Sequence, residues 1–227
     1  MTDQKLHLPG HVEAARAART PVVPRWLAVV CAGATAVCTV VFVATQPTLP
    51  QDSSELLATI ARSPSSAATS MFAFALSQLF VIGVVLAIGD LARDGARRVV
   101  GTGMVLAVVG AFGHAVFSGT RLSYLGMLTE QGRPENAAAI DRLADSPVMI
   151  FAVAGLLGTV LGLLLLGVGL WRSRSVARWI PAALWLFLLL EFVGSAFTSW
   201  GSIAAVTAYC AGLAGLAVAV VRRTHGS

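Results

Sequence analysis

The sequence predicts an all-α fold, namely a polytopic membrane protein whose six-transmembrane-helix bundle has its N and C termini in the cytoplasm. Of the 227 residues, 56% are hydrophobic and 12% are charged, whereas a soluble domain usually carries about 25% charged residues. The apolar residues also gather in blocks of about twenty, the length that crosses a ~30 Å hydrocarbon core. The basic residues lie at the ends of these blocks and set the predicted orientation.

The apolar blocks form one predicted transmembrane domain over residues 26–221. A polar N-terminal tail over residues 1–25, expected to be mobile, precedes it, and a cytoplasmic tail over residues 222–227 follows it. No cleavage site follows the first block, so we expect this block to remain as an anchor. The predicted spans cover residues 26–45, 68–89, 99–120, 147–171, 179–200 and 203–221.

Two longer loops connect these spans on the predicted outer side. In residues 46–67, Asp52 or Ser53 is expected to cap a short helix that ends before Pro64. In residues 121–146, a surface helix is expected over residues 135–144, and Asp145-Ser146-Pro147 predicts the cap and first-turn proline of the fourth span. These mildly acidic loops fit either solvated caps on the bundle or a docking surface for a partner.

The cations divide unequally between the two sides. The predicted cytoplasmic side has twelve: Lys5, Arg16, Arg19, Arg25, Arg93, Arg97, Arg98, Arg172, Arg174, Arg178, Arg222 and Arg223. The opposite side has four: Arg62, Arg121, Arg133 and Arg142. Positive charge favours the cytoplasmic side, which places both termini there. Four tryptophans at span ends match an interfacial aromatic belt: Trp26, Trp171, Trp179 and Trp200.

Glu191 is the one carboxylate inside a predicted span. A charged carboxylate at that depth costs several kcal/mol, so we expect Glu191 to be protonated or partnered. Helical spacing places it on a polar stripe: Glu191, Ser195, Thr198 and Ser202. Such a stripe can line a wet crevice or hold two helices together by hydrogen bonds.

The third span carries a similar stripe: Gly110, His114, Ser118 and Arg121. His114 lies ~9 Å from the outer end of its span and Glu191 lies ~10 Å from the outer end of its own, at 1.5 Å per residue. We therefore expect the third and fifth spans to adjoin through a Glu191–His114 contact, with Arg121 above it. Gln78 in the second span either joins this cluster or bonds to backbone nearby.

Small residues four apart indicate close helix packing, either within the chain or between two copies. They occur as Gly158-x-x-x-Gly162, Ala208-x-x-x-Gly212 and Ala211-x-x-x-Gly215. A weak internal repeat is also visible, because similar segments at residues 60–64 and 143–147 precede the second and fourth spans. The repeat fits either a transporter-like duplication or a shared loop-helix pattern.

No cofactor is expected. His114 is the one intramembrane histidine, whereas a bis-histidine haem needs two, and no His-Glu-x-x-His motif for zinc occurs. The net charge is +5, but the basic residues lie at span ends rather than in a stripe that could bind nucleic acid. No nucleic acid is therefore expected as a partner. The expected partners are the lipid bilayer and a membrane protein or a second copy of the chain. The three cysteines, all inside predicted spans, are expected to be free.

Four short motifs follow one another along the chain: Glu-Leu-Leu-x-x-Ile-Ala (55–61), Leu-Ala-Arg (91–93), Arg-Arg-Val-Val-Gly-x-Gly (97–103) and Ala-Arg-Trp-Ile-Pro (177–181). In this order the chain resembles six-helix bacterial membrane proteins that are grouped only as domains of unknown function. The resemblance implies a multi-pass protein of the bacterial inner membrane and no particular activity. The sequence favours a non-enzymatic accessory or interaction subunit. The alternative is a small proton-linked transporter or permease with a site at Glu191 and His114.

Overall fold

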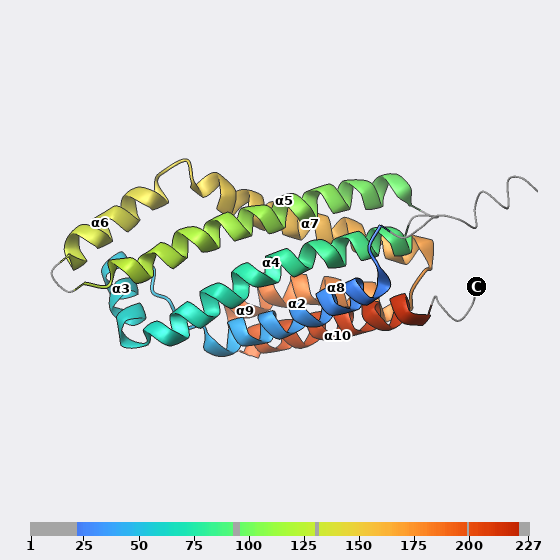
Figure 1. Cartoon of the computed structure of the whole chain (residues 1–227), viewed down its shortest axis with the longest axis horizontal. Helices are drawn as coiled ribbons and strands as arrows, with labels where there is room; N and C mark the ends of the chain where they lie inside the picture. Colours follow the sequence, from blue (N-terminus) through green and yellow to red (C-terminus); the bar gives the residue numbers. More distant parts are fainter. Residues whose placement is uncertain (1–21, 93–95, 130–131, 199, 223–227) are drawn as a thin grey trace, which may run out of the picture.

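The computed structural model describes residues 22–92, 96–129, 132–198 and 200–222, and every regular element in these ranges is helical. The predicted all-α fold is confirmed. The long helices run side by side along one axis (Figure 1). The predictions for the tail segment 1–21, for Arg93 and for the tail segment 223–227 lie outside the described residues.

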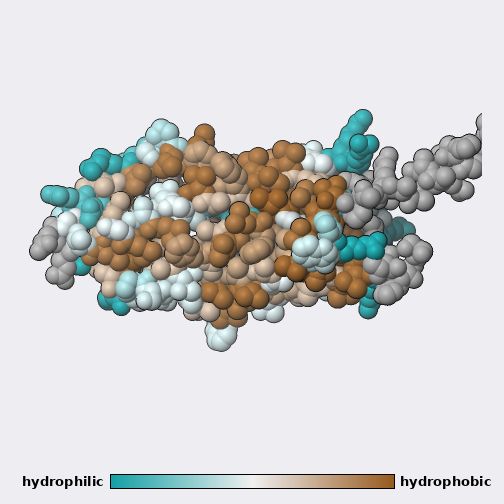
Figure 2. Space-filling view, viewed as in Figure 1, coloured by the Kyte–Doolittle hydropathy of each residue, from teal (hydrophilic) through white to brown (hydrophobic). Residues whose placement is uncertain are grey.

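Five helices of the described chain are long and apolar enough to cross a bilayer: α2 (Arg25–Thr45), α4 (Pro64–Ala92), α5 (Arg97–Leu122), α7 (Met149–Ser173) and α10 (Trp200–Arg222). Their outward faces carry large apolar side chains, such as Val105 (64% exposed) and Phe112 (59% exposed). Figure 2 shows this apolar surface along the body of the molecule, with hydrophilic residues gathered toward its ends. Soluble proteins rarely expose apolar surface on this scale, so the chain is a multi-pass membrane protein.

The predicted fifth span is not one continuous α-helix. It consists of α8 (Trp179–Leu189), the π-helix η2 (Leu190–Gly194) and the three-residue α9 (Ser195–Phe197). In η2 the Ser195 N–H donates to the carbonyl of Leu190, five residues earlier. The apolar helix formed by α8 and η2, Trp179–Gly194, is shorter than the five long helices.

The turn before the last helix differs from its predicted position. The predicted spans over residues 179–200 and 203–221 leave the turn between them at residues 201–202, but Thr198 is extended and α10 already begins at Trp200. The reason is packing, because Gly201 is buried against the backbone of Gly194. A Cβ atom at Gly201 would lie 2.5 Å from the Gly194 carbonyl oxygen.

The five long helices and α8 pack as a closed ring. Each contacts the next in the order α5, α7, α8, α10, α2 and α4, and α4 returns to α5. A shared core fills the ring, with Ile88, Leu166, Leu184 and Leu213 almost fully buried. The ring order decides which polar side chains meet.

Three short helices form a structure that we call the cap: α3 (Ser53–Arg62), the 3₁₀ helix η1 (Ser123–Met127) and α6 (Arg133–Ala144). Of the two predicted cap residues of α3, Asp52 caps the helix, because its Oδ1 accepts a hydrogen bond of 2.8 Å from the Glu55 N–H. The cap has its own apolar core, which includes Leu57, Tyr124 and Ile140. The predicted helix over residues 135–144 is also confirmed.

Prolines mark the helix boundaries around the cap. Gln46 before Pro47 is extended and ends α2, as the ring of a following proline favours. Pro64 begins α4, where its missing N–H leaves no bond unmade. Before the fourth span the prediction was wrong, because α7 begins at Met149 with no side-chain cap. Ser146 Oγ instead donates to the Leu143 carbonyl, 2.7 Å away.

Candidate functional site

Helices α5 and α7 pack closely against each other through glycines. A Cβ atom at Gly113 would lie 2.5 Å from the Gly155 nitrogen and from the Phe151 oxygen. A Cβ atom at Gly158 would lie 2.6 Å from the Gly110 nitrogen. The Gly158-x-x-x-Gly162 pattern therefore serves packing within the chain. In α10, Gly212 and Gly215 likewise face α8 residues of the same chain: Leu184, Trp179 and Ile180.

His114 lies half-buried on α5 beside this contact. Its ring meets the Phe74 ring of α4 edge-on, with 5.3 Å between centroids. The absence of a side chain at Gly155 of α7 leaves room for the ring, since a Cβ atom there would lie 3.0 Å from His114 Nδ1. Ser118 donates to the His114 backbone carbonyl over 2.7 Å, so it does not contact the imidazole through this bond.

Gln78 lies buried one turn along α4 from Phe74. Its Nε2 donates to the Ser77 hydroxyl at 2.9 Å and to the Phe74 carbonyl at 3.3 Å. Gln78 is thus bonded to its own helix. Phe74 brings the two predicted residues near one another, since it contacts the His114 ring and accepts from Gln78.

Arg121 lies half-buried near the cap end of α5. Its guanidinium stands over the Phe117 ring, 4.9 Å from the centroid. Within the described ranges no carboxylate pairs with it. A cation held over an aromatic face gains electrostatic stabilisation without a counter-ion. Arg121 therefore lies at the cap end of the α5 stripe, and its contact there is with an aromatic ring.

Glu191 lies half-buried on η2. The Ser195 hydroxyl donates to the backbone carbonyl of Glu191 rather than to its carboxylate. The carboxylate has no hydrogen bond to any residue that the structure describes. Short π-helical segments are uncommon and often coincide with functional positions. Glu191 lies within such a segment, which makes it a candidate for a functional residue.

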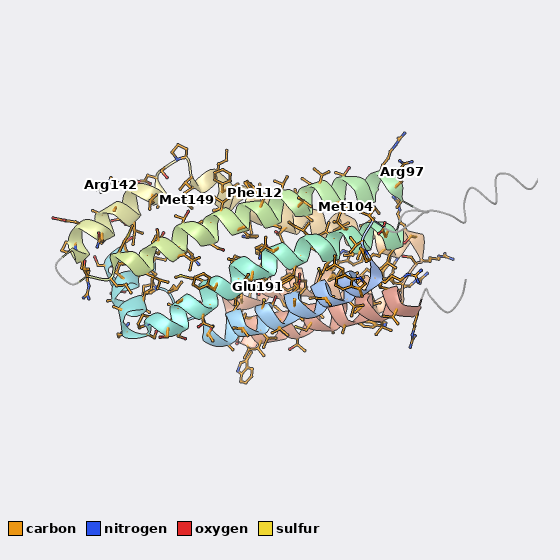
Figure 3. The ribbon with its side chains drawn as sticks, viewed as in Figure 1. Arg97, Met104, Phe112, Arg142, Met149 and Glu191 are labelled. Carbon is orange, nitrogen blue, oxygen red and sulfur yellow. The ribbon has the colours of Figure 1, made fainter. Side chains whose placement is uncertain are left out.

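The structure does not bring Glu191 and His114 together. The helices packed on α5 are α4 and α7, whereas η2 packs on α8, α9 and α10. In Figure 3 Glu191 lies away from α5, the helix that carries the labelled Phe112. The prediction that the third and fifth spans adjoin through this pair is wrong, because α7 lies between them in the ring. Equal depth in two spans does not make the spans neighbours.

Sequence reasoning missed the role of Asp90, which lies just outside the predicted span over residues 68–89. Asp90 belongs to the last turns of α4, and its Oδ2 accepts from the backbone N–H groups of Val22 (2.8 Å) and Val23 (3.3 Å). The carboxylate thus anchors the chain just before α2. Its signal in the sequence was its place directly after the apolar run that ends at Gly89.

The described residues contain no group of three or more His, Cys, Asp or Glu side chains that could hold a metal ion. The three cysteines are free, as predicted. No curated protein and no solved structure matches this chain. A family model described as "Domain of unknown function (DUF4386)" matches residues 27–222, which extend from the first residues of α2 to the end of α10. The predicted resemblance to an uncharacterised family is confirmed, and the chain belongs to the DUF4386 family.

Proposed function

We propose that this protein is a non-enzymatic accessory or interaction subunit of the bacterial inner membrane. The observation that carries the proposal is the separation of the two deep ionisable side chains. His114 packs between α4 and α7, and Glu191 lies on η2 beyond α7. A proton-coupled mechanism through this pair needs both groups in one pocket, and the packed α5–α7 glycine contact leaves them in separate places.

We further propose that six segments cross the membrane, with α8 and η2 forming the fifth crossing and both termini in the cytoplasm. The distribution of charge supports this topology. Arg97 and Arg142, which belong to the predicted inner and outer sides, lie at opposite ends of the bundle (Figure 3). The first described residues before α2 and the end of α10 lie at the same end as Arg97 (Figure 1).

Single-cysteine labelling tests this topology. In a variant without its natural cysteines, Ala138→Cys on the exposed face of α6 is expected to react with a membrane-impermeant maleimide from outside the cell. Ser227→Cys is expected to react only after the membrane is opened. Labelling of both positions from the same side would refute the three crossings that the proposed topology places between them.

Photo-cross-linking tests the interaction role. A photoreactive amino acid at Ala138 places the probe on an exposed cap position, whereas the same residue at Val109 places it on the exposed apolar side of α5. We expect a discrete protein adduct in native membranes from Ala138, with either another protein or a second copy, and lipid adducts from Val109. Equal adduct patterns from the two positions would refute a role carried by the cap.

One observation favours the alternative function, a proton-linked transporter that uses Glu191. The carboxylate lies half-buried on a π-helix and is unbonded among the described residues. Proteoliposomes loaded with a pH-sensitive dye separate the two functions. The accessory role predicts no proton movement above that of protein-free vesicles. Proton flux that is lost in Glu191→Gln but retained in Gln78→Leu would refute the accessory role and support transport.

A further inference from the structure

A cavity of about 630 Å³, which is open to solvent, lies in the cap between α3 and the first residue of α6. Its walls come from Pro50, Glu55, Ala58, Thr59, Ala61, Arg62 and Arg133. Ligand pockets for small molecules commonly have volumes of about 300–1,000 Å³. The cavity is therefore large enough for a small solute, and it lies apart from His114 and Glu191.

The amphipathic character of α3 explains why the cavity exists. One face of α3 buries Leu57 and Ile60 in the cap core. The other face presents the small side chains of Ala58 and Ala61, which leave the space above them empty. A hydrogen bond also joins α3 to α6, the two helices that line the cavity, because Ser53 Oγ of α3 donates to Asp141 Oδ1 of α6 over 2.6 Å.

Two guanidinium groups line this space. Arg62 is positioned by its own helix, since its Nη2 donates to the Thr59 hydroxyl over 2.9 Å. Arg133 comes from the start of α6 and is half-buried. Neither pairs with a carboxylate among the described residues, although Glu55 lines the same cavity. The guanidinium fork matches the geometry of carboxylate and phosphate oxygens.

We propose that the cap cavity binds a small solute through a carboxylate or phosphate group held between Arg62 and Arg133. Ala58 and Ala61 line the cavity beneath the solute. The Glu55 carboxylate, which also lines the cavity, repels part of the negative charge of the solute. The net charge of the three ionic side chains is positive, so a simple oxyanion is attracted. Location of the cavity outside the cell rests on the proposed topology, but binding in itself does not.

Protection from phenylglyoxal, which modifies arginine, tests the proposal on the full chain. The protein is placed in phosphatidylcholine nanodiscs, which expose both ends of the bundle and contain no anionic lipid. Inorganic phosphate and succinate, each at 10 mM, are compared with sodium chloride at equal ionic strength. Modification of Arg62 and Arg133 is followed by peptide mass spectrometry, and Arg142 on α6, which does not line the cavity, is the control within the same molecule.

We expect one of the two anions to slow modification of Arg62 and Arg133 at least threefold and to leave Arg142 unchanged. Protection by phosphate alone assigns a phosphate ligand, and protection by succinate alone assigns a carboxylate ligand. Equal protection of all three arginines, or protection of none, would overturn the proposal. Since the assay is independent of orientation and of proton flux, a failure here leaves the proposed function standing.

Two variants separate a built cavity from a charged surface. Ala58→Leu fills the floor while both arginines stay in place, so it is expected to abolish protection. Glu55→Gln removes the negative charge at the rim and is expected to increase protection at a given anion concentration. Unchanged protection in Ala58→Leu, in a variant that retains the wild-type melting temperature, would show loose counter-ion binding and overturn the proposal.

Discussion

Replacement of Gly113 or Gly158 by alanine is expected to part α5 from α7. Each new Cβ atom would meet backbone atoms of the facing helix at 2.5–2.6 Å, whereas ordinary contacts begin at 3.4 Å. Backbone atoms cannot rotate away as a side chain can. The helices must therefore separate by roughly 1 Å, and a radial gap of that size forfeits a quarter to a half of each dispersion contact.

The expected cost follows from this geometry. Forcing an additional methyl group into a packed interface costs about 1–3 kcal/mol. Gly119→Ala on the same helix is the matched control, because a Cβ atom there has nothing within 4 Å. In a helix interior alanine is favoured over glycine by roughly 0.5–1 kcal/mol, so the control is expected to be neutral or slightly stabilising. Gly113→Ala and Gly158→Ala should therefore lower the free energy of unfolding, whereas Gly119→Ala should leave it unchanged or raise it.

Thermal unfolding in detergent micelles measures this difference. At about 2–4 °C for each kcal/mol in a chain of this size, Gly113→Ala and Gly158→Ala are expected to lower the melting temperature by several degrees. The double variant is expected to lose less than the sum of the single variants, because both changes part the same two helices. Melting temperatures equal to that of Gly119→Ala would refute the backbone contact between α5 and α7.

Three further predictions concern single side chains. Asp52→Ala removes the 2.8 Å cap bond of α3; we expect a loss of about 1 kcal/mol, visible as hydrogen exchange in α3 that is faster by roughly fivefold, and an unchanged rate would contradict the cap. Thr35 is fully buried, and its hydroxyl has no partner among the described residues, so Thr35→Val is expected to gain about 1–3 kcal/mol. The control Thr39→Val loses a 2.8 Å bond to the Thr35 carbonyl and should bring no gain in melting temperature. Arg174 ends α7 in the left-handed region with φ 51°, which costs a side-chain-bearing residue about 1–2 kcal/mol. Arg174→Gly should therefore raise the melting temperature, whereas Arg172→Gly inside α7 should lower it.

The boundaries of the structure were largely readable in the sequence because they depend on local chemistry. A run of about twenty apolar residues, a proline such as Pro64 or a cap such as Asp52 acts within a few residues along the chain. At one boundary where the prediction failed, a contact with another segment decided the outcome. Gly201 lies between the predicted fifth and sixth spans, but the structure places it inside α10, in close contact with Gly194 of the preceding segment.

The candidate site could be predicted only in part, because it depends on contacts between segments that are distant in the sequence. Hydropathy and helical spacing identified Glu191, His114 and Gln78 as polar groups at depth. Hydropathy and helical spacing indicate how deep a residue lies in the membrane. They do not indicate which helices are neighbours in the ring. The cavity between Arg62 and Arg133 was invisible for this reason too, because these residues are separated by two long helices in the chain.

By itself the sequence determined that this chain is an all-helical, multi-pass membrane protein with short helices in its two longer loops, because the length and apolarity of each segment decide those features one segment at a time. The tertiary structure decided the rest. Glycines that permit backbone contact made α7 the neighbour of α5, and this placed α7 between His114 and Glu191. A close-packed bundle admits few neighbours to each helix, so the pairing of one face excludes the pairing of another.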